Sequence, residues 1–297
     1  MFPFIASNNP IHHILDKPVS GIESGFTIHM ASLILAAIVT LLVLRYSAKR
    51  ISVGDEGLGT DRYLTEGRLP QLVEVLTLYM RDSVIKPVLG KDTARFLPYL
   101  LSVFYFILTC NLLGMIPFAD IQVVFGKLAM QRETDWIVFG GTATSNINVT
   151  IGLAIVSFFV IQVHAFKSLG LGGWAHHLTG GAPLYLLPIM LPIEFMGMFI
   201  KPAALAIRLF ANMVGGHTML AVLTMFGMMA FEATSSWLLT GSIGVVSTIA
   251  AVIISFLELF VAFLQAFIFM FLTTVFIGQM SHHGEEHEDH ALERATH

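Results

Sequence analysis

Long apolar runs separated by short polar stretches dominate the chain. A helix needs about 20 mostly apolar residues to cross the hydrocarbon core of a bilayer. Five windows meet this requirement and are predicted to span a membrane: residues 25–44, 96–118, 146–166, 184–231 and 243–279. The last two exceed the length of one perpendicular crossing, which predicts that they are tilted. The polar stretch between them, residues 232–241, is typical of a turn, so we expect a hairpin of two long helices.

Shorter segments complete the predicted organisation. Residues 70–90 mix apolar side chains with acidic and basic ones, a pattern typical of an amphipathic helix at the membrane interface. Residues 121–130 are apolar but too short to cross, which favours a re-entrant or surface segment. The sequence therefore predicts an all-α integral membrane protein. Its parts are an outer segment over residues 1–24, a membrane domain over 25–280 and an acidic, His-rich tail over 281–297.

The composition supports a membrane location. Hydrophobic residues make up 55% of the 297 residues, charged residues only 12%, and the mean hydropathy is +0.77. Soluble domains are about a quarter charged, so this composition excludes a disordered chain and disfavours a water-soluble globule. The net charge of −4 gives a nucleic-acid partner no electrostatic support. The single cysteine, Cys110, cannot form an intrachain disulfide.

The basic residues orient the predicted helices. Residues 45–95 are rich in Lys and Arg, whereas the opposite side carries only Lys17, Lys127 and Arg132. Positively charged loops favour the cytoplasmic side of a membrane. We therefore expect the N-terminus outside and the acidic tail in the cytoplasm, which agrees with an odd number of crossings.

Charged residues inside the bilayer are the most informative, because each costs at least a few kcal/mol near the centre. The last two predicted helices contain four: Glu194, Lys201, Arg208 and Glu258. The first three are spaced by seven residues, which returns a helix to within about 20° of the same face, and Asn212 extends this face by one turn. On the last helix, Gln265 lies seven residues after the acid and Ser255 about one turn before it. Each helix thus carries one polar stripe.

Two interpretations of these stripes remain open. They can pair as buried ionic contacts between helices, but a buried ion pair gains little over an apolar contact because both charges lose their hydration. They can instead line a path for ions or protons, the interpretation we favour. Arg208 keeps its proton in a protein and can act only as a fixed positive charge. His217 and Glu258 can exchange protons near neutral pH in suitable surroundings.

Several short motifs occur in order along residues 95–280. They are Lys201-Pro202, residues 207–213 (IRLFANM), Gly215-Gly216-His217 and residues 264–269 (LQAFIF), with residues 111–117 (NLLGMIP) and 146–150 (NINVT) in addition. Together they resemble subunit a of F-type ATP synthases, the stator half of a membrane proton turbine. The residues before 70 and after 278 carry little of this resemblance.

The resemblance implies roles for the polar stripes. Arg208 would oppose the ion-binding carboxylate of each c-subunit, and Glu194 would belong to a path toward the cytoplasm. Four residues would line a half-channel open to the outside: Asn212, His217, Glu258 and Gln265. Lys201 and Ser255 would be accessory. Many bacterial members of the family have an acid at the position of His217 and a histidine at that of Glu258, so this chain exchanges the two.

The resemblance also implies partners and a location. The partners would be the c-subunit ring, the peripheral-stalk b subunits and, indirectly, the F1 head, together with protons and the lipid bilayer. The location would be a bacterial cytoplasmic membrane, with an organellar inner membrane as the alternative. No cofactor, metal or nucleotide site is expected on this chain. The sequence leaves H⁺ and Na⁺ both open, because the ligands of the ion lie mainly on the partner.

Two other function classes compete with this interpretation. A secondary transporter could use the same charges for a solute, but would work as a lone polypeptide and show a midplane pocket. A membrane enzyme would need catalytic motifs, and the chain contains no HExxH, GxSxG or GxxxxGK[ST] sequence. The histidines of the tail, residues 281–297, could bind a divalent metal, although their irregular spacing favours a solvated acidic tail.

Overall fold

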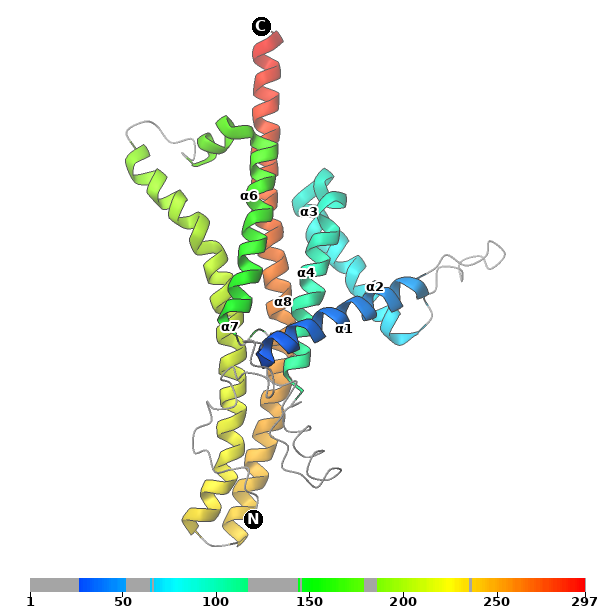
Figure 1. The fold of residues 1–297 in the computed structure, drawn as a ribbon, viewed down its shortest axis with the longest axis vertical. Coiled ribbons are helices and arrows are strands. Elements are labelled where there is room, and N and C mark those ends of the chain that lie inside the picture. Colours follow the sequence, from blue (N-terminus) through cyan, green and yellow to red (C-terminus); the bar gives the residue numbers. More distant parts are fainter. Residues whose placement is uncertain are drawn as a thin grey trace, which may run out of the picture. The chain divides into compact units, whose positions relative to one another are not determined.

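The computed structural model describes residues 27–51, 65, 67–116, 144, 146–178, 186–234 and 237–296. Every regular element in these residues is a helix (Figure 1). The α-helices are α1 (Ile28–Arg50), α2 (Arg68–Tyr79), α3 (Lys86–Leu89), α4 (Thr93–Gly114), α6 (Ile147–Leu178), α7 (Leu187–Thr234) and α8 (Trp237–Thr296). A π-helix (Met80–Ile85) and a 3₁₀ turn (Gly90–Asp92) flank α3. The predicted segments 1–24 and 121–130 lie outside the described residues.

Five stretches are long and apolar enough to cross a membrane: Ile28–Arg50, Arg68–Gly114, Ile147–Lys167, Pro188–Gly216 and Gly241–Gln279. The predicted all-α membrane architecture is therefore confirmed. Large apolar side chains remain uncovered along these stretches, for example Leu41 and Phe256, each 69% exposed. Apolar surface of this extent marks contact with lipid or with other proteins.

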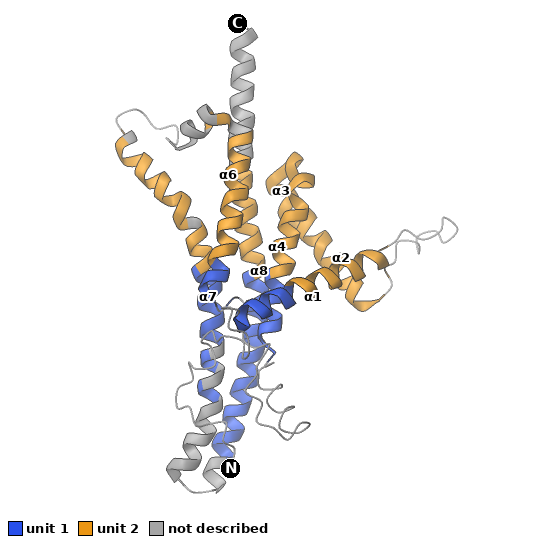
Figure 2. Cartoon of the chain, viewed as in Figure 1, with its two compact units in different colours: residues 1–36, 107–150, 207–265 blue, residues 37–106, 151–206, 266–297 orange. Residues whose placement is uncertain are grey.

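The chain forms two compact units (Figure 2). Unit 1 comprises residues 1–36, 107–150 and 207–265, and unit 2 comprises residues 37–106, 151–206 and 266–297. The long helices α7 and α8 each contribute residues to both units. In the tail, the backbone of α8 stays helical to Thr296, while the side chains of residues 280–297 lie outside the described part.

In unit 2, the helical segment that begins with α2 packs against α4. The Tyr105 hydroxyl donates a 2.9 Å hydrogen bond to the Val73 carbonyl and lies 2.7 Å from Thr77 Oγ1. The segment ends at Gly90, whose φ of 50° and ψ of −114° are readily adopted only by glycine. Thr93 Oγ1 then donates to the Gly90 carbonyl at 2.7 Å, and α4 begins. The helical segment predicted over residues 70–90 thus stops at a backbone break.

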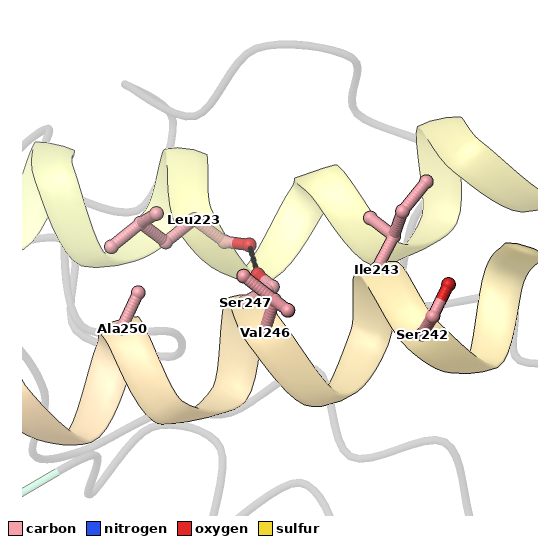
Figure 3. A pocket seen from close by; sticks show the side chains of 6 residues that line it. All are labelled: Leu223, Ser242, Ile243, Val246, Ser247 and Ala250. Atoms are coloured by element: carbon pink, nitrogen blue, oxygen red, sulfur yellow. Dashed lines mark hydrogen bonds between the residues drawn. The ribbon is translucent and has the colours of Figure 1, made fainter.

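In unit 1, α7 and α8 run antiparallel. The Ser247 hydroxyl of α8 donates a hydrogen bond to the Leu223 carbonyl of α7 (Figure 3). Further from the turn, Glu258 of α8 lies against Gly216 of α7. Residue numbers therefore decrease along α7 while the numbers of their contacts on α8 increase, as in an antiparallel pair. The two helices form the hairpin that the sequence predicts. A cavity of about 340 Å³ beside this hydrogen bond is lined by Leu223, Ser242, Ile243, Val246, Ser247 and Ala250.

Candidate functional site

Arg208 lies on the uncovered face of α7 in unit 1. Leu209 and Met213 on the same helix are 0% and 1% exposed and point into the packed interior. Arg208 is exposed, and its neighbour Ile207 is 58% exposed. No acidic side chain among the described residues forms an ion pair with Arg208. A side chain that keeps its positive charge in proteins thus lies on an exposed, apolar face of α7.

The polar groups of α8 have the opposite placement. Glu258 is 5% exposed and Gln265 is 4% exposed, so both are buried within unit 1. Asn212, one turn beyond Arg208 on α7, is partly buried. The Gln265 Nε2 atom has no hydrogen-bond partner among the described residues. A buried amide nitrogen in this state costs about 1–3 kcal/mol unless water or another group satisfies it, so the position favours a hydrated environment.

The Glu258 carboxyl group lies directly against the backbone of α7. A Cβ atom added to Gly216 would come within 2.7 Å of Glu258 Oε1 and 3.0 Å of its Cδ. Only glycine leaves room for this approach. The residue that follows is His217, whose side chain lies outside the described part of the chain. That the His217 side chain lies close to Glu258 stays a prediction. The contact of Glu258 with Gly216, one residue earlier in the chain, supports it.

Asn111 connects three parts of unit 1 and was missed as a site residue by the sequence reasoning. It is fully buried, and its Nδ2 donates a 3.1 Å hydrogen bond to the carbonyl of Ala262 on α8. The Thr144 hydroxyl donates to Asn111 Oδ1 at 3.0 Å. Ala262 lies four residues after Glu258 and three before Gln265, about 6 and 4.5 Å along the helix axis. Asn111 thus fixes α8 between its two buried polar side chains.

Three further residues complete the predicted site: Ser255, Glu194 and Lys201. The Ser255 hydroxyl donates a 2.9 Å hydrogen bond to the Ala251 carbonyl of its own helix, so its proton is engaged locally. Glu194, which is partly buried, and Lys201 both lie on α7 within unit 2. The Lys201 side chain is outside the described residues.

The described side chains contain no group of three or more His, Cys, Asp or Glu residues that could hold a metal ion. The histidines of the tail fall outside this search, and the prediction of a solvated tail stays untested. The described side chains of unit 1 include the buried Glu258 carboxyl group, the Gln265 and Asn111 amides and the Thr144 hydroxyl. A carboxyl group can take up and release a proton, and amides and hydroxyls can hydrogen-bond to water along a proton path.

Known proteins are similar to this chain over most of its length. A family model described as "ATP synthase A chain" matches residues 27–278. The chain is 38% identical over 303 residues to ATP synthase subunit a 2 of Chlorobaculum tepidum, which covers 95% of this chain and 75% of the relative. It is 37% identical over 305 residues to ATP synthase subunit a of Pelodictyon phaeoclathratiforme. This match covers 97% of this chain and 79% of the relative. ATP synthase subunit a of an Anaeromyxobacter species is 36% identical over 287 residues. This match covers 93% of this chain and 61% of the relative.

The hydrogen bonds of Asn111 predict a role in stability. Asn111→Leu keeps a similar volume but leaves the Thr144 hydroxyl buried without its acceptor, which costs about 1–3 kcal/mol. We expect a lower unfolding temperature of the purified protein in detergent, followed by a thermal melt. Leu112→Ala is the control, because Leu112 is on the same helix and 38% exposed. Equal melting of Asn111→Leu and the wild type would contradict this assignment.

Proposed function

Because this chain belongs to the ATP synthase A chain family, we propose that it provides the stationary proton channel of an F-type ATP synthase. It is subunit a, a non-catalytic, multi-pass membrane subunit of the Fo sector that assembles with other ATP synthase subunits. We propose the following mechanism for proton transfer through this subunit. Two half-channels lead protons to and from a rotating partner, and Arg208 separates them. The observation behind it is an exposed Arg208 on α7 combined with the buried Glu258 and Gln265 on α8.

Arg208 acts as a fixed charge facing the ring of c-subunits. A protonated c-subunit carboxyl group is neutral and can face lipid, whereas an ionised one cannot. Beside the guanidinium the ionised form is stabilised, so the carboxyl group releases its proton there. Because arginine does not give up its own proton, Arg208 also blocks direct proton transfer between the half-channels. Its exposure on an apolar helix face supports this role.

The outer half-channel passes Gln265, Glu258, His217 and Asn212. Glu258 and Gln265 are buried on one face of α8, and the open hydrogen-bonding capacity of Gln265 Nε2 supports the presence of water along this path. The Glu258 carboxyl group lies against Gly216, the residue that precedes His217 in the chain, which supports a pairing of Glu258 with His217. A carboxyl group and an imidazole so placed exchange a proton as a coupled pair.

The inner half-channel leads from the ring toward the cytoplasm along Glu194. Lys201 and Ser255 have accessory roles. One elementary charge that crosses 100 mV releases about 2.3 kcal/mol, so a direct connection between the two half-channels would dissipate the work available for rotation. Glu194 is partly buried on α7, which agrees with a place along a path lined by protein.

The proposed partners are the c-subunit ring at the exposed face of α7 and α8, the b subunits of the peripheral stalk and, indirectly, the F1 head. The relatives above are bacterial proteins, which supports a bacterial cytoplasmic membrane. The N-terminus would lie outside and the tail in the cytoplasm, in keeping with the basic residues of the segment 45–95.

Arg208 provides the test of the proposed channel. Arg208→Ala removes the fixed charge, so membrane vesicles that carry the assembled enzyme should lose ATP-driven proton pumping and become more permeable to protons. Arg208→Lys should also fail, because lysine lacks the planar guanidinium and can lose its proton. Ile207→Ala truncates a neighbouring exposed side chain without a change of charge and should pump normally. Normal ATP-driven proton pumping by Arg208→Ala would contradict the proposal.

Gly216 tests whether the position of the Glu258 carboxyl group matters. Gly216→Ala adds a methyl group where the flexible end of Glu258 lies, so the helix is retained but the carboxyl group must move. Since a displacement of about 1 Å can cost about 100-fold in rate at a reacting centre, we expect ATP-driven pumping to fall by about tenfold or more. Gly244→Ala on α8, where a Cβ meets no atom within 4 Å, is the control. Equal pumping by both variants would argue against this placement.

A further inference from the structure

A mainly apolar cavity with two basic residues in its lining lies in unit 2, between α4 and α6. It is a cavity of about 280 Å³. Its lining residues are Arg95, Phe96, Phe159, Val160, Val163, His164 and Lys167. Two of these are permanent or near-permanent cations, and none is acidic. The proposed proton path uses none of them.

The inner wall of this cavity is aromatic and rigidly packed. Phe96 and His164 are 7% and 4% exposed, and their rings meet edge to face with centroids 4.6 Å apart. The Arg95 guanidinium carbon lies 5.5 Å from the centroid of the Phe96 ring, within the range of a cation–π interaction. The guanidinium is thus held at the edge of the cavity while Arg95 as a whole remains exposed.

The outer wall is apolar and uncovered. Phe159 is 60% exposed and Val163 is 48% exposed, both on the same side of α6 as Lys167 by their spacing of four residues. Lys167 is the last residue of the apolar stretch Ile147–Lys167, and Arg95 lies two residues after the start of α4. The two cations therefore mark one end of a membrane-spanning region, with apolar surface leading away from them into the bilayer.

We propose that this cavity binds an anionic phospholipid. The headgroup phosphate lies between Arg95 and Lys167, and an acyl chain follows Phe159 and Val163 along α6. Basic pockets between membrane helices on the cytoplasmic side recognise anionic lipid headgroups in this way. The cytoplasmic side is also where the basic segment 45–95 places this end of the helices.

The charges around the cavity agree with an anionic occupant. Asp92 and Arg95 both act electrostatically on His164, so one carboxylate lies in the vicinity. Asp92 is not among the lining residues, and Arg95 with Lys167 leaves a positive excess at the cavity itself. The continuous apolar wall distinguishes a lipid from free phosphate, because a free ion would gain nothing from Phe159 and Val163.

The experiment counts lipids retained by the whole detergent-purified ATP synthase. Complexes with wild-type or variant subunit a are incubated with phosphatidylglycerol or phosphatidylcholine, and bound lipids are counted by native mass spectrometry. Arg95→Gln with Lys167→Gln removes both cations. Lys49→Gln with Arg50→Gln, in the last turn of α1, removes two cations elsewhere and is the matched control. Val163→Trp keeps all charges and fills the apolar side of the cavity.

The wild type and the α1 control should retain phosphatidylglycerol in preference to phosphatidylcholine. The Arg95/Lys167 variant and Val163→Trp should each retain one phosphatidylglycerol fewer per complex. Val163→Trp keeps the proposal testable should the double variant fail to assemble. Three results would overturn it: equal retention by Val163→Trp and the wild type, an equal loss in the α1 control, or displacement of the lipid by inorganic phosphate.

Discussion

A charge in the hydrocarbon core of a bilayer costs at least a few kcal/mol unless a partner or water compensates it, and this constraint governs the arrangement of α7 and α8. Arg208 lies exposed on α7, where a group of another subunit can compensate it. Glu258 is buried on α8 and placed against Gly216. The arginine side chain is therefore exposed on its helix, whereas the carboxyl side chain is buried within unit 1.

The surrounding structure maintains this division. Asn111 holds α8 through the Ala262 carbonyl and accepts a hydrogen bond from Thr144, so a residue distant in sequence fixes the helix between Glu258 and Gln265. Ser247 joins the two helices nearer their turn. Such hydrogen bonds add to van der Waals packing between apolar helices, which in lipid gain no hydrophobic driving force from association. The position of the carboxyl group thus depends on individual hydrogen bonds and on one glycine.

The sequence predicted the membrane-spanning helices well, because long apolar runs leave a local signal. Runs of apolar residues gave the five spans, and spacings of seven gave the polar stripes. Asn111 and Gly216 were not predicted as site residues, because their roles depend on residues far away in the sequence. Asn111 donates a hydrogen bond to the Ala262 carbonyl, and Gly216 leaves space for the Glu258 side chain. Ser255 stood out by spacing, yet its proton is bonded within α8.

Whether the two proposed half-channels stay unconnected can be measured by the side of the membrane from which each position is reached. Single cysteines replace Asn212, Gln265 or Glu194 after Cys110→Ser, and an impermeant thiol reagent is added to one face of sealed vesicles. Ile253→Cys, at a 62% exposed apolar position of α8, is the lipid-facing control that should resist labelling from both faces. The account predicts that positions 212 and 265 react from the outer face and position 194 from the cytoplasmic face. Labelling of all three from one face would instead indicate a continuous pore and contradict it.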